Sequence, residues 1–433
     1  MLHTYAGSIH GAPPAVAPRF SPEASDLKNL SVLLVPFLVV SAGMACSDDE
    51  DADSVRIGVL LPLTGALQSY GEASQAALEH ARDEINDDSD LSVELVFKDT
   101  GTEPATSLAM LEELHEDGIK LVIGPFASSG VTAVKEFADS NGIILISPLS
   151  TAGTLALPGD NIYRFTPDES KEGEALAAVL VADGITTIVP VNRDDDGNIG
   201  LVVGLRAAFE AAGGTLVEGV TYAANENDFP SVVGEIIAAL EAVDGPLDAT
   251  AVYLAAFGEV VDLFGAAAAI SNDALVSVPW YGSDSVALTA ELVQDADAAG
   301  FAVTAGYPNP ILGLRDEDEA LWGPVIEDVQ AELGRRPDSF ALAAYDGLIV
   351  AHMAMEAAGA DADAAELGAA LVEAASGHVG LTGPTVLNEA GDRASASFDF
   401  WSVCPDGAGF TWTRTISYAV AADGTGEVTR SEC

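Results

Sequence analysis

Hydroxyl-bearing side chains follow two apolar, strand-like segments of this sequence. Ser128 and Ser129 come after KLVIGP, and Ser150 and Thr151 come after IILISP. Ser128 and Ser129 also stand where a helical pattern begins, so their hydroxyls and the free backbone N–H groups of a first helical turn could bind a carboxylate. Thr151 could add a third donor. The alternative is that the serines are ordinary helix N-caps and Thr151 a turn residue.

One acid, Asp284, follows the strand-like segment SVPWYG. A carboxylate at the end of a buried strand is costly unless a cation neutralises it. A ligand ammonium group could supply that cation. The alternative is that Asp284 is the N-cap of a helix beginning at Val286.

The residue patterns typical of metal sites, nucleophilic catalysis and nucleotide binding are missing from the sequence. The histidines show no metal-ligand spacing and no Gly-x-Ser-x-Gly elbow lies near them, so no nucleophile can be paired with a base. Neither a Walker loop nor a GxGxxG fingerprint follows a strand. We therefore expect no cofactor, no metal and no enzymatic activity. The histidines are His3, His10, His80, His115, His352 and His378.

These candidate residues depend on alternating β and α segments that begin near Val55. The segments RIGVLLPL, SVELVFKD, KLVIGP and IILISP are predicted strands, with helices over 71–85 and 131–138 between them. Their nearly continuous apolar character favours a parallel sheet covered on both faces. Because ligands bind beyond the carboxyl ends of such strands, the hydroxyl groups are expected at one edge.

The alternation restarts after 163–166 and predicts a second, similar lobe. Strands are expected at TTIVPV, TLVEGVTY, ATAVYL, SVPWYG and FAVTAG, and helices over 172–182, 201–212, 231–242, 260–270 and 286–297. From Pro308 the pattern changes to longer helices, over 317–333, 339–358 and 364–374. A strand-like aromatic tail then begins at Ser397.

The charge balance excludes whole classes of partner. Seventeen Lys and Arg face 68 Asp and Glu, a formal net charge of −51. This charge repels nucleic acid and anionic membrane surfaces, so we expect no nucleic-acid binding. Because the acids are spread along the chain, we also hypothesise a host in salty water, where salt screens the self-repulsion.

The N-terminal region has the layout of an export signal. An apolar run over 30–45 follows Lys28 and ends in small residues before Cys46 and an acidic stretch. The layout is similar to that of lipoproteins, in which the cysteine is diacylated, although Gly43 stands where a larger residue is preferred. A transmembrane anchor is the alternative, but about 16 residues interrupted by Pro36 fall short of the roughly 20 needed.

Export places the two remaining cysteines in an oxidising compartment. Cys404 and Cys433 both lie near the C-terminus and are predicted to form a disulfide. Two free buried thiols are the alternative.

Several stretches in their order resemble the branched-chain amino acid binding proteins, which are type I periplasmic binding proteins serving ABC importers. They are IGVLLPLTGALQSYGEASQAALEHARDEIN, VIGPFASSGVTAVKEFADSNGIILISPLSTAGTL, NIYRFTP, AYDGLIVAHMAMEAAG and GPTVLNEAGD. The resemblance implies an α/β fold of two doubly wound parallel-sheet lobes joined by a three-strand hinge.

The resemblance also implies how the chain is divided. Residues 1–45 are then a signal peptide with a polar preface, and 46–53 an acidic linker after the lipidated cysteine. Lobe 1 comprises 54–166 and 308–392, and lobe 2 comprises 167–307 and 393–433, where the tail disulfide would tie down lobe 2.

Carried over residue by residue, the resemblance implies a ligand site. Ser128 and Thr151 look like the donors to a ligand carboxylate, with the backbone of Leu149 and Ser150 at the head group, and Asp284 looks like the ammonium partner. The pocket lining and a further candidate follow by the same comparison. The lining residues are Tyr70 and Phe257, where the family often has tyrosine at the second position. The further candidate is Asp196, which would favour a ligand with an extra donor; the alternative is that Asp196 is a solvated loop acid.

The implied role is an exported, lipid-anchored protein that captures an amino acid or amide-like compound and delivers it to an ABC permease in the cell envelope. A sensing subunit for a kinase or chemoreceptor has the same fold and is the alternative. A hydrolase acting through Ser128 would lack a histidine base.

Overall fold

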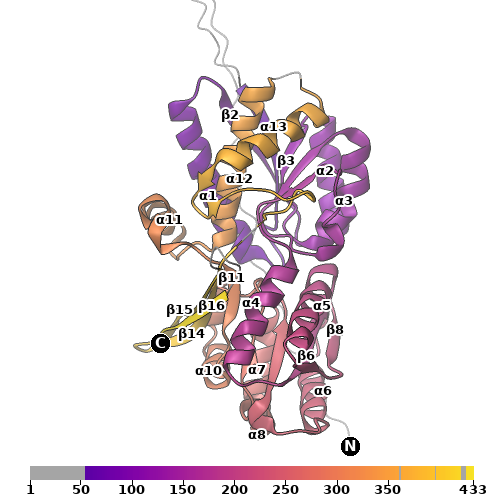
Figure 1. Cartoon of the computed structure of the whole chain (residues 1–433), viewed down its shortest axis with the longest axis vertical. Coiled ribbons are helices and arrows are strands. Elements are labelled where there is room, and N and C mark those ends of the chain that lie inside the picture. Colours follow the sequence, from indigo (N-terminus) through magenta and orange to yellow (C-terminus); the bar gives the residue numbers. More distant parts are fainter. Residues whose placement is uncertain (1–53, 360–361, 395, 421–425) are drawn as a thin grey trace, which may run out of the picture. The chain divides into compact units, whose positions relative to one another are not determined.

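The computed structural model describes residues 54–359, 362–394, 396–420 and 426–433. The predicted signal peptide, the proposed lipidation site Cys46 and the acidic linker therefore lie outside the described residues. The described part contains two parallel sheets, each flanked by helices, an antiparallel sheet and a short hairpin (Figure 1).

The first parallel sheet has the strand order β2-β1-β3-β4-β5. Its strands are β1 (Ser54–Leu61), β2 (Ser92–Asp99), β3 (Leu121–Ile123), β4 (Ile144–Ser147) and β5 (Ile162–Arg164). The connections contain α1 (Gln68–Asp88), α2 (Pro104–Glu116), α3 (Ser128–Asn141) and the 3₁₀ turn η1 (Gly153–Leu155). In α1, Tyr70, Ala73, Ala77 and Ala81 are buried. This three- to four-residue spacing turns one helix face to the core.

Helices from much later in the sequence complete this lobe. They are α11 (Glu319–Leu333), preceded by η3 (Asp316–Asp318), α12 (Ser339–Ala358) and α13 (Ala364–Gly377), and the short strands β12 (Val379–Gly380) and β13 (Gly383–Pro384) follow. In Figure 1, α12 lies beside α1, which it contacts. Of the described helices, α12 alone is long and apolar enough to cross a membrane, but 72% of its apolar window is buried in the protein. It is packed as a core helix.

The second parallel sheet has the order β10-β9-β6-β7, with β8 also paired to β6. Its strands are β6 (Thr187–Asp194), β7 (Thr215–Leu216), β8 (Val220–Ala223), β9 (Thr250–Ala255) and β10 (Trp280–Tyr281). Its helices are α4 (Glu169–Ala182), α5 (Asp196–Ala211), α6 (Phe229–Glu241), η2 (Leu247–Ala249), α7 (Val260–Ile270), α8 (Asp273–Val276), α9 (Ala290–Gln294) and α10 (Ala296–Ala305). Together the two sheets form the two-lobed α/β fold expected from the sequence.

The predicted strand TLVEGVTY is split into β7 and β8 along one edge of β6. Pro190 of β6 lies opposite the break, and it has no N–H to donate to a neighbouring strand. Gly219 is in the break, where a Cβ would lie 1.9 Å from the carbonyl oxygen of Pro190. The close approach there requires glycine.

Two predictions near the end of the second sheet are wrong. The segment FAVTAG is the second half of helix α10 and not a strand, because Ala298, Ala299, Ala302 and Ala305 bury one helical face. Asp295 caps this helix by accepting hydrogen bonds from two backbone N–H groups of its first turn. The predicted helix over 286–297 is also reduced to the short α9, which begins only at residue 290.

The tail forms an antiparallel sheet in the order β11-β14-β15-β16. Its strands are β11 (Asn309–Leu312), β14 (Phe398–Asp406), β15 (Gly409–Val420) and β16 (Gly426–Arg430). Figure 1 shows the yellow β14 beside the orange β11, as their pairing requires. A disulfide joins Cys404 to Cys433 with a Cα–Cα distance of 5.5 Å, which confirms the predicted pair and excludes two free thiols.

Candidate functional site

The hydroxyl groups predicted from the sequence lie together at the carboxyl edge of the first sheet. The Oγ atom of Ser128 accepts hydrogen bonds from Ser150 Oγ at 3.0 Å and from the Ala152 N–H at 3.3 Å. Helix α3 begins at Ser128 with Ala127 as its N-cap and has no side-chain cap, so neither serine at its start is a capping residue. The Ser128 hydroxyl proton is therefore available to an acceptor.

A buried ion pair fixes the loop that carries Ser150 and Thr151. Arg164, at the end of β5, is fully buried and forms a two-pronged contact with Asp392, with one N···O distance of 2.7 Å. The same guanidinium donates to the carbonyl oxygens of Ala152 at 2.7 Å and Ser150 at 3.3 Å. Because these carbonyls are held by Arg164, the loop keeps one backbone conformation.

Asp284 lies after β10 and is 2% exposed. Its Oδ1 atom accepts a hydrogen bond from Ser285 Oγ at 2.8 Å, and no Lys, Arg or His of the described residues pairs with it. It is not the cap of a helix, because α9 begins at residue 290 with Thr289 as N-cap. Burial raises the pKa of Asp284 to about 6, against the lowering effect of the Ser285 hydrogen bond.

Tyr70 joins the two lobes through its hydroxyl group. The Oη atom lies 3.0 Å from the Asp284 carbonyl oxygen and 2.7 Å from that of Ala287, while the ring packs edge-on against Phe340. Ser69 adds a second link, because its hydroxyl donates to Glu291 at 2.7 Å. Tyr70, which is predicted to line the pocket, therefore also makes a contact between the lobes.

Two acids that the sequence analysis did not identify lie near Asp284. Glu169 and Glu172 occupy the first turn of α4, and they are 6% and 2% exposed. Glu169 also holds the hydroxyl loop, because its N–H donates to the Thr151 carbonyl at 2.9 Å and its carboxylate accepts from the Gly153 N–H at 2.7 Å. The signal in the sequence that could have identified them is the pair of acids three residues apart at the start of a helix.

The pKa values of these two acids are both affected by Asp284. Burial raises the pKa of Glu169 to about 7, and the charge of Asp284 contributes to the rise. Burial and then the Asp284 charge raise the pKa of Glu172 well above its usual value. Glu169 therefore connects the Thr151 loop with the surroundings of Asp284.

Phe257 lies on the second lobe with a cation over its ring. The Arg193 guanidinium is 5.0 Å from the ring centroid and pairs with Asp195 at 2.8 Å and Glu259 at 3.4 Å. Glu259 also accepts from the Phe257 N–H at 3.2 Å. Arg193 could not be found from the sequence, because it comes near Phe257 only when β6 and β9 pair.

The remaining predicted residues lie at the start of two helices. Ser129 is half-buried in α3, and Asp196 is exposed in the first turn of α5 with Asp195 as the N-cap. A Cβ on the neighbouring Gly197 would lie 3.5 Å from Ser128 Oγ, so the start of α5 faces the hydroxyl cluster. Leu149 is buried at 4% exposure.

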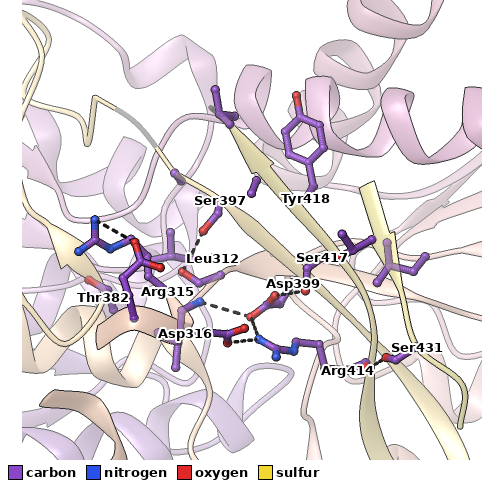
Figure 2. Close-up of a pocket in the computed structure, with 18 of the residues that line it drawn as sticks. Leu312, Arg315, Asp316, Thr382, Ser397, Asp399, Arg414, Ser417, Tyr418 and Ser431 are labelled. Atoms are coloured by element: carbon purple, nitrogen blue, oxygen red, sulfur yellow. Dashed lines mark hydrogen bonds and ion pairs between the residues drawn. The ribbon is translucent and has the colours of Figure 1, made fainter. Parts of the chain in front are cut away.

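A separate pocket of about 730 Å³ lies beside β11 and the tail strands (Figure 2). Four of its lining residues are arginines, but three of them pair with carboxylates. Figure 2 shows Arg414 between Asp316 and Asp399, at 3.0 and 3.5 Å. No predicted site residue lines this pocket. Across the described residues no group of three or more His, Cys, Asp or Glu is arranged to hold a metal ion.

Comparison with known proteins gives a consistent result. The family described as periplasmic binding protein matches residues 54–407. The Leu/Ile/Val-binding protein BraC3 of Rhizobium johnstonii is 26% identical, and the match covers 87% of this chain and 96% of that protein.

Two solved structures share the fold. The branched-chain amino acid binding protein LivJ of Streptococcus pneumoniae with isoleucine has a TM-score of 0.66 at 20% identity, covering 88% of this chain and 100% of that one. A solute-binding protein of R. palustris with benzoate has a TM-score of 0.66 at 21% identity, covering 83% of this chain and 95% of that one.

Proposed function

The chain belongs to the periplasmic binding protein family, and we propose that it captures a small amino acid or a related compound between its two lobes. The observation that carries this proposal is Asp284, a carboxylate that is 2% exposed and lacks a cationic partner in the described part of the chain. Such a group is costly unless a cation reaches it. A ligand ammonium is the simplest cation that a binding cleft receives.

The carboxylate end of the ligand is assigned to the first lobe. Ser128 and Thr151 donate to it, the backbone at Leu149 and Ser150 lies at the head group, and Ser129 is a further candidate. This assignment is supported by the free hydroxyl proton of Ser128 and by the loop that Arg164 holds. An amino acid of about nine heavy atoms that gains roughly 1 kcal/mol per atom would bind with micromolar affinity or better.

The rest of the pocket is assigned to both lobes. Tyr70 and Phe257 line the cleft, and Asp196 is available to a ligand with an additional donor. Closure brings the lobes together through contacts such as Tyr70 with the Asp284 carbonyl. We assign 54–166 and 308–392 to lobe 1 and 167–307 and 393–433 to lobe 2, which is supported by burial of Ile311 and Leu342 in the core of the first sheet.

Delivery and location complete the proposal. The protein is exported, anchored through lipid on Cys46, and passes its ligand to an ABC permease. The two solved structures of transporter binding proteins that share the fold support transport. A sensing subunit for a kinase or chemoreceptor is the alternative function. A hydrolase acting through Ser128 has no support, because among the described residues this hydroxyl contacts Ser150 and Ala152.

A thermal-shift screen tests the proposed ligand class. The panel contains the standard amino acids, short amides, urea and benzoate, because binding to the folded state alone raises the melting temperature. Stabilisation by an amino acid is expected, and it should disappear in Asp284→Asn, which keeps the side-chain shape but removes the charge. Stabilisation by benzoate alone, or full binding by the variant, would contradict the proposal.

A further inference from the structure

Glu172 is a buried acid whose carboxyl oxygens make no hydrogen bond of normal geometry with the described residues. Its side chain is 2% exposed, and both carboxyl oxygens are buried without a hydrogen-bond partner among the described groups. Among the described residues, the carboxyl group that can share a proton with Glu172 is that of Asp284. Neither acid forms an ion pair with any described Lys or Arg residue.

Two carboxylates in contact in a buried site cannot both keep their charge cheaply. Each loses its hydration, and the two charges repel each other at low dielectric. Two ionised carboxylates also cannot hydrogen-bond, because both only accept. One proton between them removes one charge and creates a charge-assisted hydrogen bond.

The surroundings place that proton on Glu172. Asp284 already accepts a hydrogen bond from Ser285 Oγ at 2.8 Å, which stabilises its ionised form. The carboxyl oxygens of Glu172 make no hydrogen bond of normal geometry in the described chain. The Asp284 N–H favours the charged form of Glu172, but its effect on the Glu172 pKa is smaller than the opposing effects of burial and of the Asp284 charge. A neutral Glu172 can therefore donate to the Asp284 carboxylate.

The other groups that face Glu172 also disfavour a second charge. Tyr253 of β9 is fully buried, and burial followed by the charge of Glu172 raises the pKa of its hydroxyl group. Glu169 precedes Glu172 by one helical turn, and its own pKa is raised. The Arg164 guanidinium acts on the neighbouring Glu169, and it is already paired with Asp392. The titratable and charged groups around the pair are thus Glu169, Tyr253, Tyr307, Arg164 and Asp168.

We propose that Glu172 stays protonated in the ligand-free protein, hydrogen-bonds through that proton to the Asp284 carboxylate, and releases the proton to water when the cationic group of a ligand enters the cleft. The ligand cation then faces two carboxylates, and the released proton balances the charge. The proposal rests on the proposed function, and it narrows the ligand class to compounds with an ammonium or similar cationic group. Glu172 is a positioning residue that acts through Asp284.

Two pH effects follow with defined signs. A cation competes with the proton, so the affinity for amine-bearing ligands falls as the pH falls. In the ligand-free protein Glu172 binds its proton more tightly when folded than when unfolded. Its stabilising effect is therefore complete below the unfolded pKa and is lost as pH rises through the folded pKa.

The first experiment needs no ligand. Urea unfolding of the wild type and Glu172→Gln is measured from about pH 5 to about pH 8 at fixed KCl concentration. Glutamine imitates the protonated side chain and can donate to Asp284. Where Glu172 retains its proton, the unfolding constant of the wild type should rise by up to about tenfold per pH unit relative to that of the variant.

A matched control lies on the same helix. Glu174 is exposed and pairs with Lys171 at the surface, at 3.1 Å, so Glu174→Gln should keep the wild-type pH profile. Parallel profiles for the wild type and Glu172→Gln would overturn the proposal, because Glu172 would then titrate as an ordinary surface acid.

The second experiment measures the released proton in the wild type. Each standard amino acid is titrated calorimetrically near pH 7 in phosphate and in Tris, whose ionisation enthalpies differ. We expect about one proton released per bound ligand, and a smaller release with Glu172→Gln. Binding without any release would refute the coupling but leave the proposed function intact. If no amino acid binds, the proposed function fails, while the unfolding profiles still decide whether Glu172 holds a proton.

Discussion

Replacing Arg164 by methionine should destabilise the protein strongly, because this residue neutralises a buried acid. Arg164 is fully buried and Asp392 is 1% exposed at its side chain. Removing one partner of such a pair costs about 3–5 kcal/mol, since the other charge stays buried alone. The Ala152 carbonyl also loses its donor at 2.7 Å, which adds about 1 kcal/mol. Arg164→Met should therefore lower the free energy of unfolding by about 4–6 kcal/mol.

The double variant Arg164→Met with Asp392→Leu separates the two contributions. It removes both charges, so only the lost carbonyl hydrogen bonds remain, and the cost should fall to about 1–2 kcal/mol. Unfolding is followed in urea by tryptophan fluorescence at fixed KCl, because guanidinium salts would screen the strong negative charge. A single variant that costs less than about 1 kcal/mol, or a double variant no more stable than the single one, would refute this reasoning.

Three further predictions concern closure, the tail and the surface charge. Tyr70→Phe keeps the ring packing but leaves the carbonyls of Asp284 and Ala287 without their donor in the closed form. Calorimetry should therefore show a ligand affinity about 5- to 30-fold lower than that of the wild type. Unchanged affinity would show that the hydroxyl does not favour closure. Cys404→Ser with Cys433→Ser should lower the free energy of unfolding by about 3–4 kcal/mol, and a urea midpoint equal to that of the oxidised wild type would contradict this. Raising KCl from about 0.1 M to about 1 M shortens the Debye length from about 10 Å to about 3 Å, so the urea midpoint should rise; a midpoint indifferent to salt would rule out the screening hypothesis.

The helices and strands whose apolar residues repeat at a clear spacing could be predicted from the sequence. The helices Val260–Ile270 and Ser339–Ala358 and the strand Ser92–Asp99 have the predicted bounds. Their apolar residues repeat at a spacing that only one secondary structure can bury. The segment FAVTAG failed, because six residues of mixed β-branched and small type fit either structure. Its helical state depends on the Asp295 cap and on the buried alanine face that begins at Ala298 and continues through the segment.

The residues of the candidate site also divide into those that could be predicted from the sequence and those that only the fold brought together. The sequence by itself predicted Ser128, Thr151 and Asp284 as candidates, because each follows a strand-like segment and ligands bind beyond the carboxyl ends of parallel strands. Only the tertiary structure brought Arg164 to Asp392 and Glu172 to Asp284, since the two members of each pair are far apart in the chain. The charge state of a buried acid depends on such neighbours. The sequence therefore offered candidate groups for a ligand, and the fold set the neighbours on which the pKa values of those groups depend.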